Sequence, residues 1–102
     1  MYKRVKEWVN IPFSYKPFIK YSGTGSEVFG DAVQGLCYPE GSCTVVRNRK
    51  GVDVTSNTKL YIDGDVQISD LDCVIFDGKE HSVHAITDYY RDGAKDIRVV
   101  YI

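Results

Sequence analysis

The 102-residue sequence has little that would place it in a membrane or on a secretory route. It contains no apolar run of membrane-spanning length, and the segment from Met1 to Trp8 lacks the apolar stretch of a signal peptide. These absences predict an intracellular product. The three cysteines, Cys37, Cys43 and Cys73, are an odd number, which argues against a framework of disulfides. We expect free thiols that pack as small apolar side chains, although a bridge between Cys37 and Cys43 is geometrically conceivable.

The sequence also lacks a recognisable metal site. His81 and His84 are three residues apart, which in a strand places them on opposite faces, so that they cannot easily share one ion. An acidic cluster opens with residues 63–65, as calcium loops do, but Gln67 then stands at the third ligand position and Ile68 where glycine is needed. Its members are Asp63, Asp65, Asp70 and Asp72. We expect these aspartates to form turns or to be solvated, with a weak divalent-ion site as the alternative.

Catalytic and cofactor motifs are absent as well. The glycine-rich stretch 22–26 begins like a dinucleotide-binding fingerprint, but Val28 stands where the third glycine belongs. That motif requires a buried strand before the glycines and a long helix after them, and the sequence predicts neither clearly. No serine or cysteine stands in a recognisable nucleophile context. The sequence therefore predicts a mobile loop at 22–26, no cofactor and no enzymatic activity.

What the sequence does contain is a regular series of turn signals. Gly51, Gly64, Gly78 and Gly93 are 13, 14 and 15 residues apart, and the last three each follow an aspartate. Asp-Gly between apolar segments favours a hairpin, because the turn needs a positive φ that glycine adopts without strain. The segments between these turns are rich in Val, Ile, Thr and Tyr. We predict an all-β fold, a small antiparallel β-barrel of about six to seven strands with long loops in the N-terminal half.

The clearest strand runs from Val52 to Ile62, where the alternation of apolar and polar residues has a period of two. Leu60 and Ile62 should be buried on the same face as Val52 and Val54. Further strands are expected over residues 3–9, 28–37, 43–49, 73–76, 80–90 and 95–102, with a short one at Val66 and Ile68 and a turn over residues 38–42. Residues 12–30 should be irregular, because Pro12 and Pro17 interrupt a ladder, and the only helix candidate is short, near residues 26–33.

Aromatic residues are concentrated in the N-terminal part, where Lys16 and Lys20 lie between them. The candidate docking aromatics are Trp8, Phe13, Tyr15 and Phe18. Such interleaving can serve single-stranded nucleic acid on a barrel, but the net charge of −1 favours docking to protein instead. The charge is split, since residues 1–50 carry eight Lys/Arg and four Asp/Glu (+4) and residues 51–102 carry five and ten (−5). Surfaces of opposite sign can meet head to tail between copies of one chain, although chance and turn aspartates also account for the split.

The C-terminal part of the chain resembles a known family. The pattern is Gly51-x-x-Val54-x-Ser56, Lys59-Leu60-Tyr61-Ile62, Ser69-Asp70-x-Asp72-x-Val74-x-Phe76-Asp77-Gly78 and His81-x-Val83-x-Ala85-Ile86. It is similar to the small head–tail connector proteins of long-tailed bacteriophages, also described as minor capsid or head-completion ("stopper") proteins. The resemblance covers about residues 43–102, and the N-terminal part matches only in being short, aromatic and loop-rich.

The resemblance implies a single domain over residues 1–102 that assembles as a ring at the head–tail interface of the virion, after a period in the host cytoplasm. Its partners would be the portal–adaptor ring, tail proteins and its own copies, with packaged DNA touched only in the channel. In stopper members a loop closes that channel; the candidates here are Ser22, Gly23, Thr24, Gly25 and Ser26, and Leu36, Tyr38, Pro39, Glu40, Gly41 and Ser42. The alternatives are a tail-side completion or terminator protein of similar fold and a small-barrel nucleic-acid-binding module.

Overall fold

The computed structural model describes residues 7–102, apart from the side chain of Ser42, and these residues contain nine strands and no helix. The strands are β1 (Ile11–Lys16), β2 (Phe18–Tyr21), β3 (Glu27–Phe29), β4 (Val33–Arg47), β5 (Asp53–Asp63), β6 (Cys73–Phe76), β7 (Lys79–Ser82), β8 (Ala85–Arg91) and β9 (Ala94–Tyr101). Every strand pairing is antiparallel, so the predicted all-β class is confirmed. Nowhere in this described part does an apolar helix reach the length that a bilayer requires.

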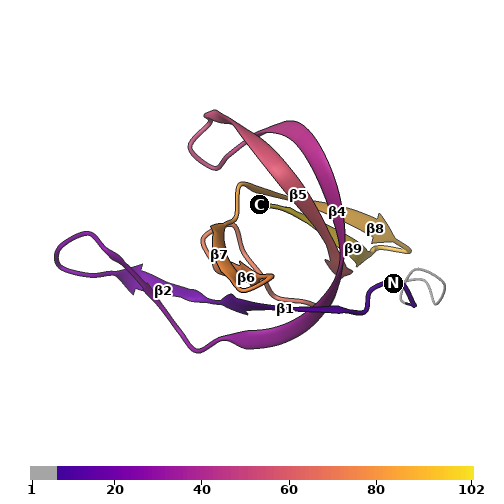
Figure 1. The fold of residues 1–102 in the computed structure, drawn as a ribbon, viewed down its shortest axis with the longest axis horizontal. Coiled ribbons are helices and arrows are strands. Elements are labelled where there is room, and N and C mark those ends of the chain that lie inside the picture. Colours follow the sequence, from indigo (N-terminus) through magenta and orange to yellow (C-terminus); the bar gives the residue numbers. More distant parts are fainter. Residues whose placement is uncertain (1–6) are drawn as a thin grey trace.

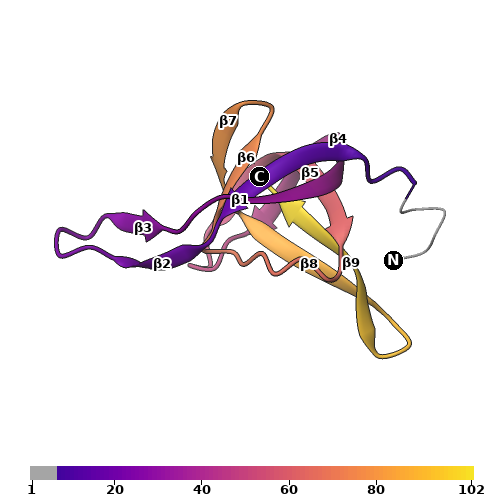
Figure 2. The ribbon, with the colours of Figure 1, turned by 90° about the horizontal axis from the view of Figure 1, so that it is seen from below.

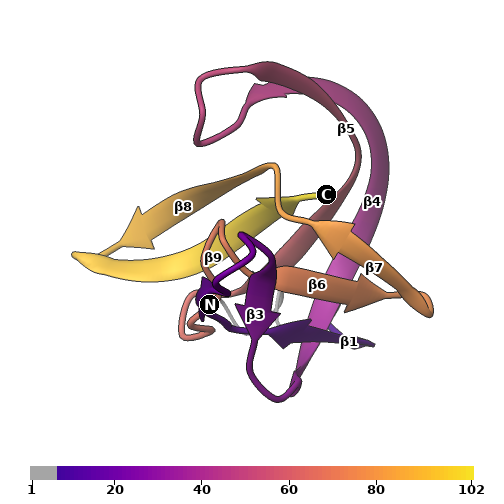
Figure 3. The ribbon, with the colours of Figure 1, turned by 90° about the vertical axis from the view of Figure 1, so that its left-hand side faces the viewer.

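Seven strands form one curled sheet in the order β7-β6-β1-β4-β5-β9-β8 (Figure 1). The long strands β4 and β5 arch over the shorter ones (Figure 3). The pairings of the described residues do not join β7 to β8, so they do not close the barrel that the sequence predicted. Between these two strands Val83 is buried in the core, and the His84 N–H donates to the Tyr101 carbonyl (2.8 Å). The single strand expected over residues 80–90 is therefore interrupted at Val83 and His84. It forms two strands, β7, which pairs with β6, and β8, which pairs with β9.

The core lies inside the curl and confirms the predicted register of β5. Leu60 and Ile62 are both completely buried, whereas Val52 at the other end of the segment is 55% exposed. The predicted apolar face is therefore correct where β5 crosses the core. It is wrong at the end of the β4–β5 hairpin, because that end extends beyond the core. The other core residues are Phe13, Tyr15, Cys37, Ile68, Val74, Val83, Val100 and Ile102.

Two of the three Asp-Gly pairs make the predicted hairpins. Asp77 and Gly78 join β6 to β7 with φ of 53° and 73°, and Asp92 and Gly93 join β8 to β9 with φ of 53° and 82°. Paired positive φ values are the geometry of the tight turn that fits the twist of antiparallel strands. The expectation is wrong for Gly64, which ends β5 without starting a hairpin. A Cβ at Gly64 would lie 2.1 Å from the Lys95 carbonyl oxygen, so this glycine is required by its close approach to β9.

Strand β4 replaces two expected strands and the turn between them. It runs without a break through Pro39 and Gly41, pairing first with β1 and then, from Tyr38 onward, with β5. A register shift between Gly41 and Thr44 marks a bulge in the ladder. The candidate loop 36–42 is thus part of a strand. Proline is tolerated because the β1–β4 ladder stops at the Ile11–Cys37 pair, so that Pro39 is paired on one side only, with Leu60 of β5.

The N-terminal part is also more ordered than predicted. Residues 12–30, expected to be irregular, contain β1, β2 and β3, and the helix candidate at residues 26–33 is occupied by β3 instead. Proline is again no obstacle, since Pro12 lies in β1 and Pro17 falls between β1 and β2. The strand expected over residues 3–9 lies mostly outside the described residues, and residues 7–9 form no strand; Val66 and Ile68 are likewise irregular.

Candidate assembly surfaces

Residues 18–29 form a two-stranded hairpin that projects from the body, and we call it the arm. Its strands β2 and β3 pair with each other and with no strand of the seven-stranded sheet. Figures 1 and 2 show it extending away from the rest of the chain, in a molecule that measures 46 × 30 × 29 Å. Its tip is the predicted loop 22–26, in which the Ser22 hydroxyl accepts from the Ser26 N–H (3.1 Å). The arm therefore offers surface on several sides.

A buried carboxylate fixes the base of the arm to the body. Asp72 is only 6% exposed, and its Oδ1 accepts from the backbone N–H of Phe18, the first residue of β2 (2.8 Å). Its other oxygen accepts from the Ser69 N–H (2.8 Å), and the Ser69 hydroxyl donates to Oδ1 (3.1 Å). Across the hairpin, the Gly30 N–H donates to the Pro17 carbonyl (2.8 Å). Asp72, expected to form a turn or to be solvated, thus orients the arm.

Apolar side chains cover the arm unevenly. Phe18 makes edge-on ring contacts with Tyr21 (centroids 5.0 Å apart) and Phe29 (6.3 Å), which gives the hairpin a small aromatic cluster of its own. A register shift between Phe18 and Lys20 places Ile19 in a bulge. Ile19 and Tyr21 remain 58% and 52% exposed, with the exposed Lys20 between them. Ile19, beside Lys20, is therefore the most exposed apolar side chain of the arm, whereas Tyr21 lies on the opposite face, where it packs on Phe18.

A second exposed surface lies on β4, β5 and β9. Trp8 packs against Tyr38 (ring centroids 6.2 Å apart), and Tyr38 packs against Tyr61 on the neighbouring strand (6.0 Å). With Glu40 and Ile97 they line a shallow, almost wholly apolar depression of about 240 Å³. Trp8 is 65% exposed. We call these five residues the aromatic patch.

The electrostatics of the aromatic patch are set by Glu40. Burial, followed by the negative charge of Glu40, raises the pKa of the Tyr61 hydroxyl, and the nearby Lys59 only partly offsets this. Glu40 has no ion-pair partner among the described residues. The patch is therefore an apolar surface that includes one negatively charged side chain, a composition typical of a protein-docking site.

The arm and the aromatic patch lie at opposite ends of the molecule. In two perpendicular views the arm extends to one side, while β9, which carries Ile97, lies on the other (Figures 1 and 2). Tyr38 and Tyr61 are neighbours across the β4–β5 ladder, and Tyr61 pairs with Val99 of β9. One copy therefore presents two different surfaces facing different directions.

The structure divides the four candidate docking aromatics. Phe13 and Tyr15 are core residues, 4% and 6% exposed, because they lie on the inner face of β1 and the Phe13 ring covers Gly35 of β4. They are not available for docking in the folded chain. Trp8 is exposed in the aromatic patch, and Phe18 is half-buried in the arm.

The loop candidates divide in the same way. Ser22, Gly23, Thr24, Gly25 and Ser26 lie at the arm tip. Of the residues taken as a second loop, Leu36 and Tyr38 are exposed strand residues, and Tyr38 and Glu40 belong to the aromatic patch. Sequence reasoning missed Ile19, Tyr61 and Ile97. The alternation of β5 indicated that Tyr61 faces away from the core, but its neighbours across the ladder could not be read locally.

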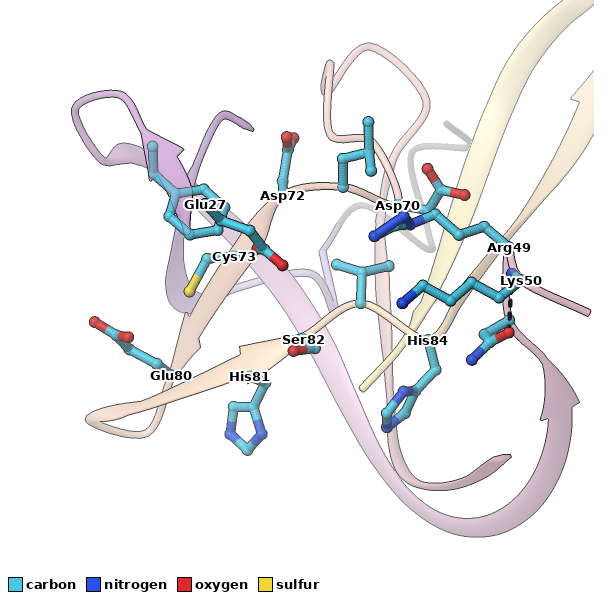
Figure 4. Close-up of a pocket in the computed structure, with 14 residues that line it drawn as sticks. Glu27, Arg49, Lys50, Asp70, Asp72, Cys73, Glu80, His81, Ser82 and His84 are labelled. Carbon is cyan, nitrogen blue, oxygen red and sulfur yellow. Dashed lines mark hydrogen bonds between the residues drawn. The ribbon is translucent and has the colours of Figure 1, made fainter. Parts of the chain in front are cut away.

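A larger groove of about 510 Å³ lies between the arm, the β4–β5 hairpin and β7. Arg49 and Lys50 lie at one end of it and Glu27 and Glu80 at the other (Figure 4). Asp70 also lines it. Because these charges are of both signs, the groove offers no uniform field for a polyanion such as nucleic acid.

His81 and His84 both line this groove and are both half-buried (Figure 4). The expectation that they point to opposite faces of one strand is wrong, because β7 ends at Ser82. Within residues 7–102, no group of three or more His, Cys, Asp or Glu side chains is placed to hold a metal ion.

The three cysteines are free thiols. Cys37 and Cys43 lie on the same strand, and no bridge joins them. Burial raises the pKa of the Cys37 thiol to about 11, which makes it a poor nucleophile at neutral pH. Burial, followed by the negative charge of Glu80, also raises the pKa of Cys73. Neither environment activates a thiolate.

A buried arginine holds together the irregular segment between β5 and β6. Arg98 is 8% exposed, and its Nη1 donates to the carbonyls of Val66 (2.8 Å) and Ile68 (2.6 Å). Its Nε donates to Asp88 Oδ1 (2.7 Å). Burial by itself would raise the pKa of Asp88, but the hydrogen bond and charge of Arg98, with the charge of Lys95, outweigh burial and lower that pKa. The Asp88–Arg98 pair therefore joins β8 and β9 to the irregular segment between β5 and β6.

Comparison with known proteins adds no family to this description. No family model matches the chain, and no curated protein matches its sequence significantly.

Proposed function

We propose that this chain is a structural virion protein that forms a ring at the head–tail interface of a long-tailed bacteriophage. In this role it closes the DNA channel after packaging and presents a docking surface for the tail. Portal–adaptor and tail proteins are its partners, and packaged DNA meets only the surface that lines the channel.

The observation that carries the proposal is the pair of unlike surfaces at opposite ends of one copy. A ring is built from heterologous contacts, in which one surface of each copy meets a different surface of the next. The arm and the aromatic patch are two such surfaces, and each exposes apolar side chains that a monomer leaves in water. The sequence pattern from Gly51 to Ile86, which resembles the connector proteins, supports the same role independently.

The nucleic-acid-binding alternative loses part of its basis. It depended on aromatic residues interleaved with lysines, but Phe13 and Tyr15 are buried. Lys16 is paired with Glu80 (3.2 Å). The residues that remain exposed are few, and the net charge of −1 offers little attraction to phosphates.

The proposal is tested by a nonsense mutation in the phage gene that encodes this chain. We expect packaged heads that lose their DNA and carry no tails, seen by electron microscopy, and rescue by the wild-type protein supplied in trans. Intact tailed particles that still inject DNA would contradict the proposal. Full heads that retain DNA but lack tails would favour the tail-side alternative.

A further inference from the structure

We propose that the arm of one copy docks on the aromatic patch of a neighbouring copy, with the bulge residue Ile19 on its apolar floor and Lys20 beside it facing Glu40. The inference rests on the proposed function, because it takes the ring of identical copies as given and names the contact that joins them. The occupant of the aromatic patch is thus the bulge of β2, Ile19 with Lys20, of a second copy of this chain.

The shape and chemistry of the arm favour this occupant. Ile19, the bulge residue of β2, is 58% exposed, and the next residue is the exposed cation Lys20. Tyr21 points to the opposite face, where it packs on Phe18. The arm is narrow, since it is two strands wide, and it stands clear of its own body (Figure 2). Its base is fixed by Asp72, so that docking orders fewer residues than a free loop would require.

The aromatic patch complements the arm in both respects. Its depression is lined by Trp8, Tyr38, Tyr61 and Ile97, which suits an apolar side chain of the size of isoleucine. Glu40 at its rim has no ion-pair partner among the described residues, and the same is true of Lys20 on the arm. A Lys20–Glu40 contact between copies would pair two opposite charges that have no ion-pair partner within residues 7–102 of their own copy.

Sedimentation velocity of the isolated protein over a range of concentrations tests the docking. The arm variant is Ile19→Ser, and the patch variant is Trp8→Ser with Tyr38→Thr; all three positions are exposed, and thermal melts check that each variant folds. We expect weak association of the wild type that proceeds beyond dimers, and a loss of at least about tenfold in affinity in either variant. The matched control is Tyr90→Ser, which removes an equally exposed aromatic residue outside both surfaces and should associate like the wild type.

Mixing the two variants gives the sharper result. The arm variant keeps an intact aromatic patch and the patch variant keeps an intact arm, so that a mixture can form one contact only. We expect a one-to-one dimer that does not grow further. Charge reversal offers an independent check: Lys20→Glu and Glu40→Lys should each weaken association, and the double variant should recover it.

Each other outcome overturns the inference. These outcomes are a wild type that stays monomeric up to its solubility limit, variants that associate normally, a mixture that forms no dimer, and a wild type that stops at a closed dimer. Failure of the contact and failure of the proposed function remain distinguishable. If the arm and patch variants still complete heads in the phage, the proposed function stands and this contact is wrong. If the wild-type protein associates through these residues but phage that lack the protein still form intact heads, the contact stands and the proposed function is wrong.

Discussion

Leu60, near the C-terminal end of β5, is one of the core residues whose burial the alternation of the strand predicts. Its side chain is completely inaccessible to solvent, and it lies directly across the ladder from Val100, which is also fully buried. The alternation that predicted its burial depends only on the period of two in a strand, which is a local property.

We expect Leu60→Ala to lower the free energy of unfolding by about 2–4 kcal/mol, because the substitution removes buried methyl groups and leaves a cavity. Denaturant melts measure the effect. Val45→Ala is the matched control, since Val45 is 67% exposed on β4 and its replacement should cost less than about 1 kcal/mol. A loss below about 0.5 kcal/mol for Leu60→Ala would mean that the register of β5 is wrong.

The Asp88–Arg98 pair gives the protein a pH dependence with a definite sign. The pKa of Asp88 in the folded chain lies below its ordinary value of 3.8, so the carboxylate stabilises the fold fully above that value. This contribution is lost as the pH falls from 3.8 through the lower folded pKa. We expect Asp88→Asn to lower stability by about 1–3 kcal/mol at neutral pH and to lose less than the wild type on acidification through this window.

Urea melts at several pH values test this prediction. The control is Asp92→Asn, whose side chain is 94% exposed in the β8–β9 turn and whose stability profile should follow that of the wild type. Parallel profiles for Asp88→Asn and the wild type through the acid window would contradict the assignment.

At the scale of elements, the arm depends on one carboxylate for its attachment. We expect Asp72→Ala to cost about 1–3 kcal/mol, because it leaves the N–H groups of Phe18 and Ser69 without their acceptor. Asp70→Ala, two residues away and exposed, should change stability by less than about 0.5 kcal/mol. Equal costs for the two variants in thermal or urea melts would contradict the anchoring role of Asp72.

The arm should also be the least protected pair of strands. Its hydrogen bonds join two exposed strands only, and such isolated hairpins open easily. In hydrogen exchange of the isolated protein, we expect amides of β2 and β3 to be protected at least about tenfold less than those of Leu60 and Ile62 in β5. Protection of the arm equal to that of β5 would show that the arm is more tightly held than its pairings indicate.

The elements that could be predicted are those whose signals are local. Asp-Gly located two hairpins, and alternation located β5 through its buried end. The signals failed where tertiary contacts decide: Pro39 and Gly41 suggested a turn, but β4 continues through both residues in its ladder with β5. Gly64 suggested a hairpin and is instead required by the close approach of β9.

The candidate surfaces were predictable only in part, for the same reason. The polar, glycine-rich composition of residues 22–26 indicated a loop, and that loop is the arm tip. The aromatic patch brings together Trp8, Tyr38, Tyr61 and Ile97, which are far apart in the sequence. Only the strand order places them side by side, and strand order is not encoded in any single segment.

For the whole molecule, we expect copies that associate only weakly alone and that form a closed ring only on a preassembled portal–adaptor complex. The chain has its own core, so that it need not associate in order to fold. Light scattering at low and high salt measures this. Raised salt should weaken contacts between the +4 and −5 halves, because exposed charges are screened beyond about 8–10 Å at physiological ionic strength. A permanent, salt-insensitive dimer that ignores those complexes would contradict both the assembly model and the connector role.

The separation of β2 and β3 from the main sheet has a consequence for how the protein can diversify. Substitutions along residues 18–29 leave every backbone hydrogen bond of the seven-stranded sheet in place, so the arm can change in sequence while the body keeps its stability. Exchanging residues 18–29 between related chains should therefore change which partner is bound. The chain that receives the new segment must keep an aspartate at position 72, because this side chain accepts the hydrogen bond from the first residue of the arm.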